Sequence, residues 1–414
     1  MKIAVFTNQF PAKACTFMAR DIAALNKNGI LVDIHAFYPY DDKYWKFVPK
    51  IIYSDVFSKK NVFHLKLFRF KSFYYFFKLL IKKPGHVISK CFFVYKSSIK
   101  FGAKQFFKTL YVSIKAIIWS EEKSFSQYDH IMAYWGNYAG TLAYLLHHLC
   151  ELKNSSSIFL HAGTDLYRDQ IILKEKLLYA DLIFTECDYN IKYIEKMYPE
   201  LKNSRKLLIH YNGIDIENFR FNHDRETKKI LAVGGLSKYK GFDFLLKAIG
   251  ILVDKGLNIQ LELVGEGAEM ENLLNLSKSL NLGKHFKLTK WIPFEDVKKK
   301  MSKCTIFIHP SAGDGDCTPN VLKESMATGS PVIASNVSGI PEVLEQGKSG
   351  RLVPTKNIKE LAKNIEQLLM DDDARINYSN SGRKWIEKTF NMWKNGEKMA
   401  CAIKDIRNKT TSLS

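Results

Sequence analysis

The residues best suited to chemistry lie in one loop and in the helix expected after it. Asp314 and Asp316 follow an apolar run over 306–308 that predicts a buried strand, and Glu324 comes eight residues after Asp316. Two aspartates flanking one residue could hold Mg²⁺ or Mn²⁺ through a nucleotide diphosphate. Carboxylates also accept hydrogen bonds from vicinal sugar hydroxyls without any ion. Because the loop runs straight into the helix that carries Glu324, the sequence favours hydroxyl recognition by Asp316 and Glu324.

The start of that helix is the second chemical feature. Thr318 is expected to cap it, Pro319 to take its first position and Gly329 to end it. Unpaired amides and the positive end of the helix dipole favour a phosphate or an electron-rich sugar oxygen at such a place. The loop and the helix together predict an anion site.

Two other loops carry residues of a similar kind. Segment 234–241 places glycines where a strand meets a helix, with Lys240 at the turn, so backbone amides and a lysine can approach a diphosphate. A tight turn alone also explains these glycines, and the Walker pattern Gly-x-x-x-x-Gly-Lys-Ser/Thr is absent. His161 ends another expected strand and is followed by Gly163 and Asp165. A lone histidine is usually structural, but the carboxyl end of a strand favours a functional one.

Alternating strands and helices are needed to position these loops, and the hydrophobic pattern predicts them. Apolar runs alternate with helical patterns from residue 2 to about 215 and again from residue 229. The polar stretch 222–229 is expected to link the halves, and everything from residue 358 onward is expected to be helical. This rhythm predicts an α/β fold of two doubly wound units in tandem. Such units bind ligands at the carboxyl ends of their strands, here in a cleft between the halves.

Length and composition agree with this fold class. A chain of 414 residues exceeds one ordinary core, and 46% hydrophobic with 25% charged residues excludes disorder and fibres. The seven cysteines are scattered without a Cys-x-x-Cys pair, which favours a reducing compartment. The start is expected to be a strand and not a secretion signal, and no apolar run reaches the roughly 20 residues of a membrane-spanning helix.

The positive charge is concentrated in residues 43–120, called here the basic aromatic segment. It holds 17 Lys and Arg residues against one acid, Asp55, and so carries +16 of the total +20. Basic residues around an apolar aromatic face suit an interfacial helix on an anionic membrane. A basic helix packed on its own domain is the alternative, and nucleic acid is disfavoured because no binding motif accompanies the charge. Lysines spaced mainly by four, which predict one face of a helix, are Lys96, Lys100, Lys104, Lys108 and Lys115. The expected membrane-binding residues are Lys71, Lys78, Lys82, Lys83, Lys100, Lys104 and Lys108.

Together these motifs resemble the family-4 retaining glycosyltransferases of the GT-B fold, especially the bacterial enzymes that build exopolysaccharide, capsule or lipopolysaccharide on a lipid carrier. The most specific match is the family's Glu, seven residues, Glu motif, present as Asp316 and Glu324 in a run that continues to Glu342. Supporting matches are 233–241, 264–267, 161–165, 212–215 and 390–393. The resemblance covers most of the chain and weakens over the basic aromatic segment.

The resemblance implies two Rossmann-like domains that face a cleft, with a C-terminal helix crossing back to the first. Residues 1–220 plus about 395–414 would bind the acceptor, and residues 221–394 would bind the nucleotide-sugar donor. Glu324 would hold the ribose, Asp316 a hydroxyl of the transferred sugar, Lys240 the diphosphate, and His161 the sugar near the reacting carbon. The implied catalytic residues are His161, Lys240 and Asp316. The implied donor-binding residues are Gly235, Lys240, Gly265, Asp316, Thr318, Pro319, Asn320, Val321 and Glu324.

Two positions depart from the family pattern. The usual diphosphate arginine is Gly235 here, so one leaving-group cation is missing unless Lys238 substitutes. Asp316 replaces the more frequent Glu, which shortens the reach by one methylene.

The sequence therefore predicts a retaining, metal-independent glycosyltransferase without a cofactor, bound peripherally to the inner face of the cell membrane. A UDP-sugar is the favoured donor, GDP-mannose is an alternative, and the acceptor is a lipid-linked or growing glycan. No convincing carboxylate nucleophile accompanies the motif, so attack from the leaving-group face is the implied route to retention. The alternatives are a sugar-nucleotide-binding partner subunit that has lost turnover and a sugar-nucleotide epimerase of the same fold.

Overall fold

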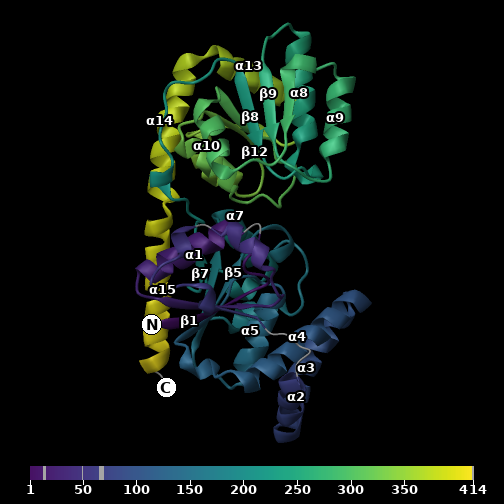
Figure 1. Cartoon of the computed structure of the whole chain (residues 1–414), viewed down its shortest axis with the longest axis vertical. Coiled ribbons are helices and arrows are strands. Elements are labelled where there is room, and N and C mark those ends of the chain that lie inside the picture. Colours follow the sequence, from purple (N-terminus) through teal and green to yellow (C-terminus); the bar gives the residue numbers. More distant parts are fainter. Residues whose placement is uncertain (13–14, 49, 65–69, 413–414) are drawn as a thin grey trace. The chain divides into compact units, whose positions relative to one another are not determined.

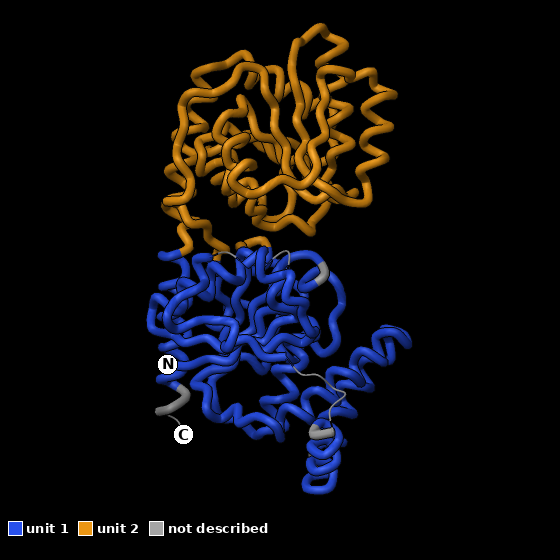
Figure 2. Tube along the Cα trace, viewed as in Figure 1, with its two compact units in different colours: residues 1–186, 190–210, 393–414 blue, residues 187–189, 211–392 orange. Residues whose placement is uncertain are grey.

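The computed structural model describes residues 1–12, 15–48, 50–64 and 70–412 (Figure 1). The chain divides into two compact units, drawn in two colours in Figure 2. Unit 1 comprises Met1–Glu186, Asn190–His210 and Trp393–Ser414, and unit 2 comprises Cys187–Tyr189 and Tyr211–Met392.

The boundary between the units lies before the stretch expected to link them. Residues 211–220, assigned to the first domain from the sequence, belong to unit 2. The expected linker at 222–229 is also part of unit 2, because Arg225 donates hydrogen bonds to the carbonyl oxygens of Met301 and Cys304, each at 3.1 Å. A partly buried arginine therefore anchors to unit 2 a stretch that looks like a polar linker in the sequence.

Unit 1 is organised around a parallel sheet with strand order β3-β2-β1-β4-β5-β6-β7. Alternate residues of β1 enter different cores: Ala4 and Phe6 pack on one face, and Ile3 and Val5 on the other. Both faces are thus covered, as is usual for parallel sheets. The strands are β1 (Lys2–Thr7), β2 (Leu31–Ala36), β3 (Val62–His64), β4 (His130–Ala133), β5 (Ser155–Leu160), β6 (Leu182–Thr185) and β7 (Leu207–Ile209).

The helices of unit 1 include three that extend from the body of the unit, α2, α3 and α4 (Figure 1). Helix α4 packs on α5, and α2 and α3 both pack on α4. The single helical face expected for the lysines between 96 and 115 is wrong, since α3 ends at Ile99 and α4 begins at Ala103. Gly102 between them has φ 83°, which ends one helix and starts the next. The helices are α1 (Thr16–Lys27), α2 (Phe70–Lys82), α3 (Pro84–Ile99), α4 (Ala103–Glu122), α5 (Tyr138–Leu149), α6 (Leu173–Tyr179), α7 (Asp188–Met197) and α15 (Met392–Ser412).

Unit 2 contains a second parallel sheet, with strand order β10-β9-β8-β11-β12-β13. Ile230 and Ala232 of β8 pack against α8, α9 and α13, while Leu231 and Val233 pack against α10, α11 and α14. The strands are β8 (Lys229–Val233), β9 (Gln260–Val264), β10 (Phe286–Thr289), β11 (Ile306–His309), β12 (Val332–Asn336) and β13 (Arg351–Pro354). The helices are α8 (Phe242–Asp254), α9 (Met270–Ser279), α10 (Phe294–Lys303), α11 (Asn320–Ala327), α12 (Ile340–Val343), α13 (Ile358–Met370) and α14 (Asp372–Thr389). The predicted α/β fold of two doubly wound sheets is confirmed.

Helix α15 returns the end of the chain to unit 1. Met399, Ala400 and Ile403 are buried in the core that includes Ile3 and Val5. A Cβ on Gly396 would lie 2.1 Å from the Cβ of Ala24 in α1, so glycine allows the two helices to touch. Within the described part of the chain, no helix combines the length and apolar character that crossing a bilayer demands.

Candidate functional site

The loop between β11 and α11 carries the central residues of unit 2. Helix α11 begins at Asn320 with Pro319 as its N-cap, so the expected cap at Thr318 is wrong. The reason is that Pro319 has ψ 126°, which keeps the chain extended one residue longer than predicted. The buried hydroxyl of Thr318 has no hydrogen-bond partner among the described residues. Gly329 follows the C-cap with φ 81°, as predicted for the residue that ends the helix.

Asp316 lies buried within this loop and contacts three side chains. Its Oδ1 atom is 2.5 Å from Nζ of Lys240, and its Oδ2 atom is 3.0 Å from both Nε2 of His309 and Oγ of Ser311. Burial alone would raise the pKa of the Asp316 carboxyl, but the charges and hydrogen bonds of His309 and Lys240 outweigh it and hold the pKa well below its usual range. Asp316 is therefore an ionised carboxylate held in place by its three partners.

A close approach between two loops brings Lys240 to Asp316. A Cβ on Gly241, which has φ 70°, would lie 2.1 Å from the carbonyl oxygen of Pro310. The amide of Ala312 donates to the carbonyl oxygen of Tyr239 at 2.7 Å and ties the loops together. The structure thus brings together two residues, separated by 76 positions, that the sequence placed in different motifs.

Glu324 and the first residues of α11 form the other side of the loop. Glu324 is buried at 6% exposure, and neighbouring Lys323 donates from Nζ to the carbonyl oxygen of Asn212 at 2.6 Å. The first amides of a helix lack partners within it, and those of Asn320 and Val321 occupy these positions in α11. The Oδ1 atom of Asn320 is buried without a partner among the described residues. The helix start therefore offers polar atoms to an anion or a sugar.

The glycines of unit 2 differ in what they permit. A Cβ on Gly265 would lie 1.9 Å from the carbonyl oxygen of Gly234, so glycine there serves the packing of the loops after β8 and β9. Gly235 is exposed, and no described atom lies within 4 Å of where its Cβ would be. Lys238 is also exposed. A larger side chain therefore fits at Gly235.

The two aspartates of this loop have different surroundings. Asp316 is engaged with Lys240 and His309, whereas Asp314 is exposed. Among the residues described, no group of three or more His, Cys, Asp or Glu side chains is arranged to hold a metal ion. The geometry favours Asp316 as a hydrogen-bonding carboxylate.

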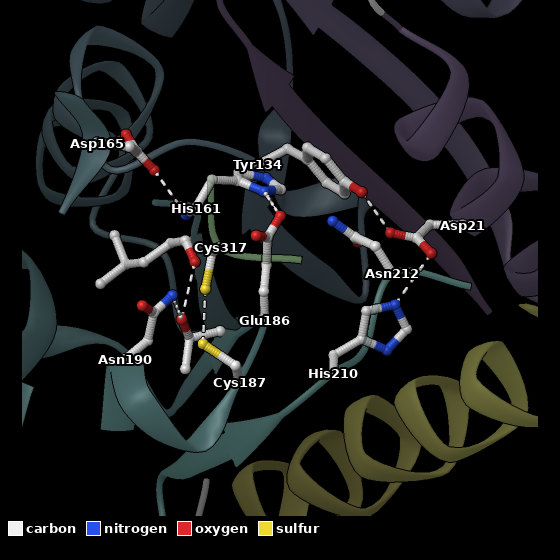
Figure 3. A network of polar contacts seen from close by, with 12 residues as sticks. Asp21, Tyr134, His161, Asp165, Glu186, Cys187, Asn190, His210, Asn212 and Cys317 are labelled. Carbon is white, nitrogen blue, oxygen red and sulfur yellow. Dashed lines mark hydrogen bonds and ion pairs between the residues drawn. The ribbon is translucent and has the colours of Figure 1, made fainter. Parts of the chain in front are cut away.

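In unit 1, His161 follows β5 directly and pairs with Glu186 (Figure 3). Its Nδ1 atom is 2.7 Å from Oε1 of Glu186, and no described residue pairs with its buried Nε2 atom. Burial alone would lower the pKa of His161, but the hydrogen bond and charge of Glu186, with the charges of Asp165 and Asp21, raise it above its ordinary value. An imidazole oriented by a carboxylate can donate or accept a proton through its other nitrogen.

The loops around His161 are fixed by a second set of contacts. Asp165 accepts hydrogen bonds from the amides of His161 and Asn137, at 3.0 and 3.2 Å. Nζ of Lys176 lies 2.5 Å from the carbonyl oxygen of Gly136, and burial lowers the pKa of Lys176 to about 7. Trp135 packs on the imidazole with its ring centroid 4.3 Å from that of His161. His161 therefore lies against an aromatic ring, with its backbone and its imidazole both held by buried carboxylates.

Unit 1 contains a further buried carboxylate, that of Asp21 in α1. Asp21 accepts from the hydroxyl of Tyr134 and lies 2.9 Å from Nε2 of His210 (Figure 3). In unit 2, the sulfur atoms of Cys187 and Cys317 are 2.6 Å apart, and both residues are buried.

Several of these residues escaped prediction from the sequence. His309 and Ser311 flank Pro310 at the end of an apolar strand, and Glu186 follows the strand Leu182–Thr185. The available signal was that His309 ends a strand and that Ser311 and Glu186 follow strands, at the sheet edge where functional loops gather. Nothing in their spacing distinguishes them from other polar residues there.

The basic aromatic segment contributes the exposed surface of α2, α3 and α4, called here the α2–α4 surface. Lys82, Lys100 and Lys104 are exposed on it, while Lys78 pairs with Glu121 at 2.7 Å and Lys83 with Glu151 at 3.1 Å. Its exposed apolar side chains are Phe73, Tyr74, Phe77, Ile81, Ile88, Phe92, Phe93, Ile99, Phe107 and Leu110.

Three other lysines of the segment are not part of this exposed set. Lys108 is half-buried, with Nζ 5.3 Å from the ring centroid of Tyr138. Lys115, expected on the same basic face, is buried and donates to the carbonyl oxygen of Phe37. The side chain of Lys71 lies outside the described residues.

Parts of this chain are similar in sequence to known proteins. Residues 214–385 match the family model "Glycosyl transferases group 1". The amylovoran biosynthesis glycosyltransferase AmsK of Erwinia amylovora is 26% identical over 409 residues, covering 94% of this chain and 96% of that protein. An uncharacterized glycosyltransferase of Haemophilus influenzae is 36% identical over 176 residues, which cover 41% of this chain and 48% of that protein.

Solved structures give the fold. HepE of Anabaena, crystallised in complex with UDP, superposes with a TM-score of 0.69 at 15% identity over 98% of this chain and 99% of its own. The fold of the chain, with its two parallel sheets, is thus the GT-B fold. The match to the glycosyl transferases group 1 model is confined to residues 214–385, less than half of the chain.

Proposed function

We propose that this protein is a retaining glycosyltransferase that moves a sugar from a UDP-sugar to a lipid-linked or growing glycan in cell-surface polysaccharide synthesis. The observation that carries the proposal is the buried Lys240–Asp316 pair beside the start of α11. It joins a cation suited to a diphosphate with a carboxylate suited to a sugar hydroxyl. The likeness to AmsK, named for amylovoran biosynthesis, supports the polysaccharide role, and the UDP complex of HepE supports the nucleotide.

The reaction needs stabilisation of the leaving group more than of the donor itself. Breaking the bond between sugar and diphosphate places new negative charge on the phosphate oxygen, and Lys240 with the first amides of α11 would stabilise it. Glu324 would hold the ribose hydroxyls and Asp316 a hydroxyl of the sugar. We assign all of these interactions to residues of unit 2. In this proposal the cations and amides of the protein stabilise the leaving group, and no metal ion is needed.

Retention is proposed to follow from attack on the leaving-group face. The acceptor hydroxyl bonds to the anomeric carbon while the bond to the diphosphate breaks, and its proton passes to the departing phosphate oxygen. Glu186 contacts Nδ1 of His161, so Nε2 of His161 would contact the sugar during this step. Isolation of a covalent glycosyl-enzyme intermediate would contradict this route.

The α2–α4 surface is proposed to contact an anionic membrane. Lys82, Lys100 and Lys104 lie among exposed aromatic and aliphatic side chains, and apolar burial together with charge attraction binds such surfaces to lipid. A membrane-bound acceptor gives this surface a purpose. The protein would then be a peripheral membrane protein.

The test is a panel of sugar nucleotides followed by a transfer assay. A ligand that binds the native state raises the melting temperature, so UDP-glucose, UDP-galactose, UDP-N-acetylglucosamine and GDP-mannose can be ranked by thermal shift. Turnover is then followed as release of UDP or GDP with lipid extract as acceptor. Lys240→Ala and Glu324→Ala should abolish the shift or the turnover.

Lys255→Ala is the matched control, because Lys255 is also ion-paired, at 2.6 Å to Glu366, but on the exposed surface of unit 2. Binding without nucleotide release would favour a partner subunit that has lost turnover. Interconversion of sugars without an acceptor would favour an epimerase. Absence of any shift, with Lys240→Ala and Glu324→Ala behaving as wild type, would refute the proposal.

A further inference from the structure

The two oxygens of Asp316 have partners of different kinds. Oδ2 meets Nε2 of His309 and Oγ of Ser311, each at 3.0 Å, and both residues are fully buried at 1% and 0% exposure. His309 is the last residue of β11, a central strand of the unit 2 sheet, so its position is set by the sheet. Oδ2 is therefore held by groups that have little freedom to move.

Oδ1 is held differently. Its partner Lys240 lies on a short 3-10 turn, Lys238–Lys240, and reaches Asp316 through a long side chain that is 14% exposed. Lysine presents a point charge on a flexible stem, so it can exchange one anion for another without moving the backbone. The contact to Oδ1 can change while the contacts to Oδ2 persist.

We propose that His309 and Ser311 are positioning residues for the donor sugar, because they fix Asp316 so that Oδ1 accepts a sugar hydroxyl once Lys240 turns to the diphosphate. This inference rests on the proposed function. The shorter reach of Asp compared with Glu makes such anchoring useful, since an aspartate on this loop has fewer rotamers with which to find the sugar. His309 and Ser311, at the end of β11, would thus determine which hydroxyl of the donor sugar Asp316 can reach.

His309 and Ser311 would act on the recognition of the sugar and not on the recognition of the nucleotide. His309 and Ser311 contact Oδ2 of Asp316. Of the proposed nucleotide contacts, Lys240 meets only the other oxygen, Oδ1, and Glu324 and the α11 amides lie on another element. Loss of His309 should therefore weaken binding of a UDP-sugar while leaving the binding of UDP unchanged. A merely structural role would weaken both equally.

The experiment is calorimetry with UDP and with UDP-glucose, or with whichever UDP-sugar gives the largest thermal shift in the panel. His309→Leu should weaken UDP-sugar binding about tenfold or more, equivalent to about 1.4 kcal/mol, with UDP affinity unchanged within about twofold. His309→Gln, which can return a donor near Oδ2, should restore most of the loss. Ser311→Ala should give a smaller loss of the same kind and covers the case in which His309→Leu fails to fold.

The pH dependence provides a second readout. Because His309 helps to hold the pKa of Asp316 low, removing it should move the acidic fall in UDP-sugar affinity to higher pH. Equal losses for UDP and UDP-sugar, or no loss for either, would overturn the inference and leave the proposed function standing. A wild-type protein that binds no sugar nucleotide would overturn both.

Discussion

Most of the proposed binding of the donor sugar depends on the carboxylate of Asp316. It is buried, ionised and bonded to a lysine, a histidine and a serine, and a buried carboxylate of this kind stabilises the fold only while its partners remain. Its surroundings therefore tie the stability of unit 2 to pH, and the sign follows from the direction of its pKa shift.

Asp316→Asn should reduce the acid sensitivity of unit 2. The folded-state pKa of Asp316 lies below its ordinary value of 3.8, so its contribution to stability is present above about pH 4 and is lost as pH falls further. Urea unfolding between pH 6 and pH 3 should show a smaller loss for the variant, by roughly 1–3 kcal/mol. Asp314→Asn is the control, because Asp314 is exposed on the same loop. Equal pH dependence in wild type and Asp316→Asn would contradict the prediction.

Gly235→Arg should raise activity. No described atom would obstruct a side chain at Gly235, and an added guanidinium beside the diphosphate would stabilise the leaving group. One charge-assisted hydrogen bond of about 1.4 kcal/mol corresponds to roughly a tenfold gain in turnover. Initial rates of nucleotide release measure it. Gly235→Ala, which adds bulk without charge, should behave as wild type, and a drop in rate for Gly235→Arg with an unchanged melting temperature would argue against a diphosphate at this place.

His161→Ala should separate turnover from nucleotide binding. His161 belongs to unit 1, and the proposed nucleotide contacts belong to unit 2. Loss of a positioned imidazole typically costs about 10²–10⁴-fold in rate. Turnover should fall by that order, while the UDP affinity measured by calorimetry stays the same. A parallel loss of UDP binding would assign His161 a structural role instead.

Residue types and spacing were sufficient to predict some of these positions. His161, Lys240, Asp316 and Glu324 stand in motifs specific enough to be found, although their roles stay predictions. His309 and Asp316 are only seven residues apart, but their contact depends on how the loop between them folds back, which residue spacing does not record. Thr318 was wrongly predicted as a cap because the backbone angles of Pro319, and not its residue type, decide where the helix starts.

At the scale of elements, α2, α3 and α4 combine a packed face and an exposed face. Leu79 of α2, Val87 of α3 and Val112 of α4 are buried in a core of unit 1, whereas Phe77 and Phe92 are exposed. The composition of residues 43–120 predicted a basic aromatic surface. Composition and lysine spacing did not reveal the break between α3 and α4, which lies at Gly102, where the chain takes a positive φ.

Charge reversal on the α2–α4 surface should weaken membrane binding. Lys82→Glu, Lys100→Glu and Lys104→Glu together should lower sedimentation with anionic vesicles, since each basic residue near such a surface contributes about 1 kcal/mol. Added salt should weaken wild-type binding in the same direction. The same change at Lys255, Lys284 and Lys287 of unit 2 keeps the net charge equal and is the control. Equal sedimentation of the two triple variants would show that only total charge matters.

At the scale of the molecule, the sequence predicted two α/β halves and missed where they divide. The boundary at residues 210 and 211 is hidden because the polar stretch after it folds into unit 2 through Arg225. The return of α15 to unit 1 was implied by the family resemblance. Contacts between residues far apart in the sequence hold it there: Gly396 meets Ala24, and Arg407 pairs with Asp129 at 2.9 Å.

Removal of residues 393–414 should destabilise unit 1 more than unit 2. Met399 and Ile403 fill a core of unit 1, and deleting a buried side chain of this size costs about 2–5 kcal/mol. Differential scanning calorimetry should show a lower or missing transition for one unit, while UDP still raises the melting temperature of the other. A single unshifted transition would contradict this prediction.

The same helix sets an order of events during synthesis. The core around Ile3 and Val5 needs Met399 and Ile403, so the first unit to be translated is the last to be completed. The segment 211–392 leaves the ribosome whole before α15 does, and domains generally fold as units when they emerge. Until α15 emerges, the nascent chain exposes the apolar face that α15 will cover, and a chaperone that binds such faces would have its longest access there.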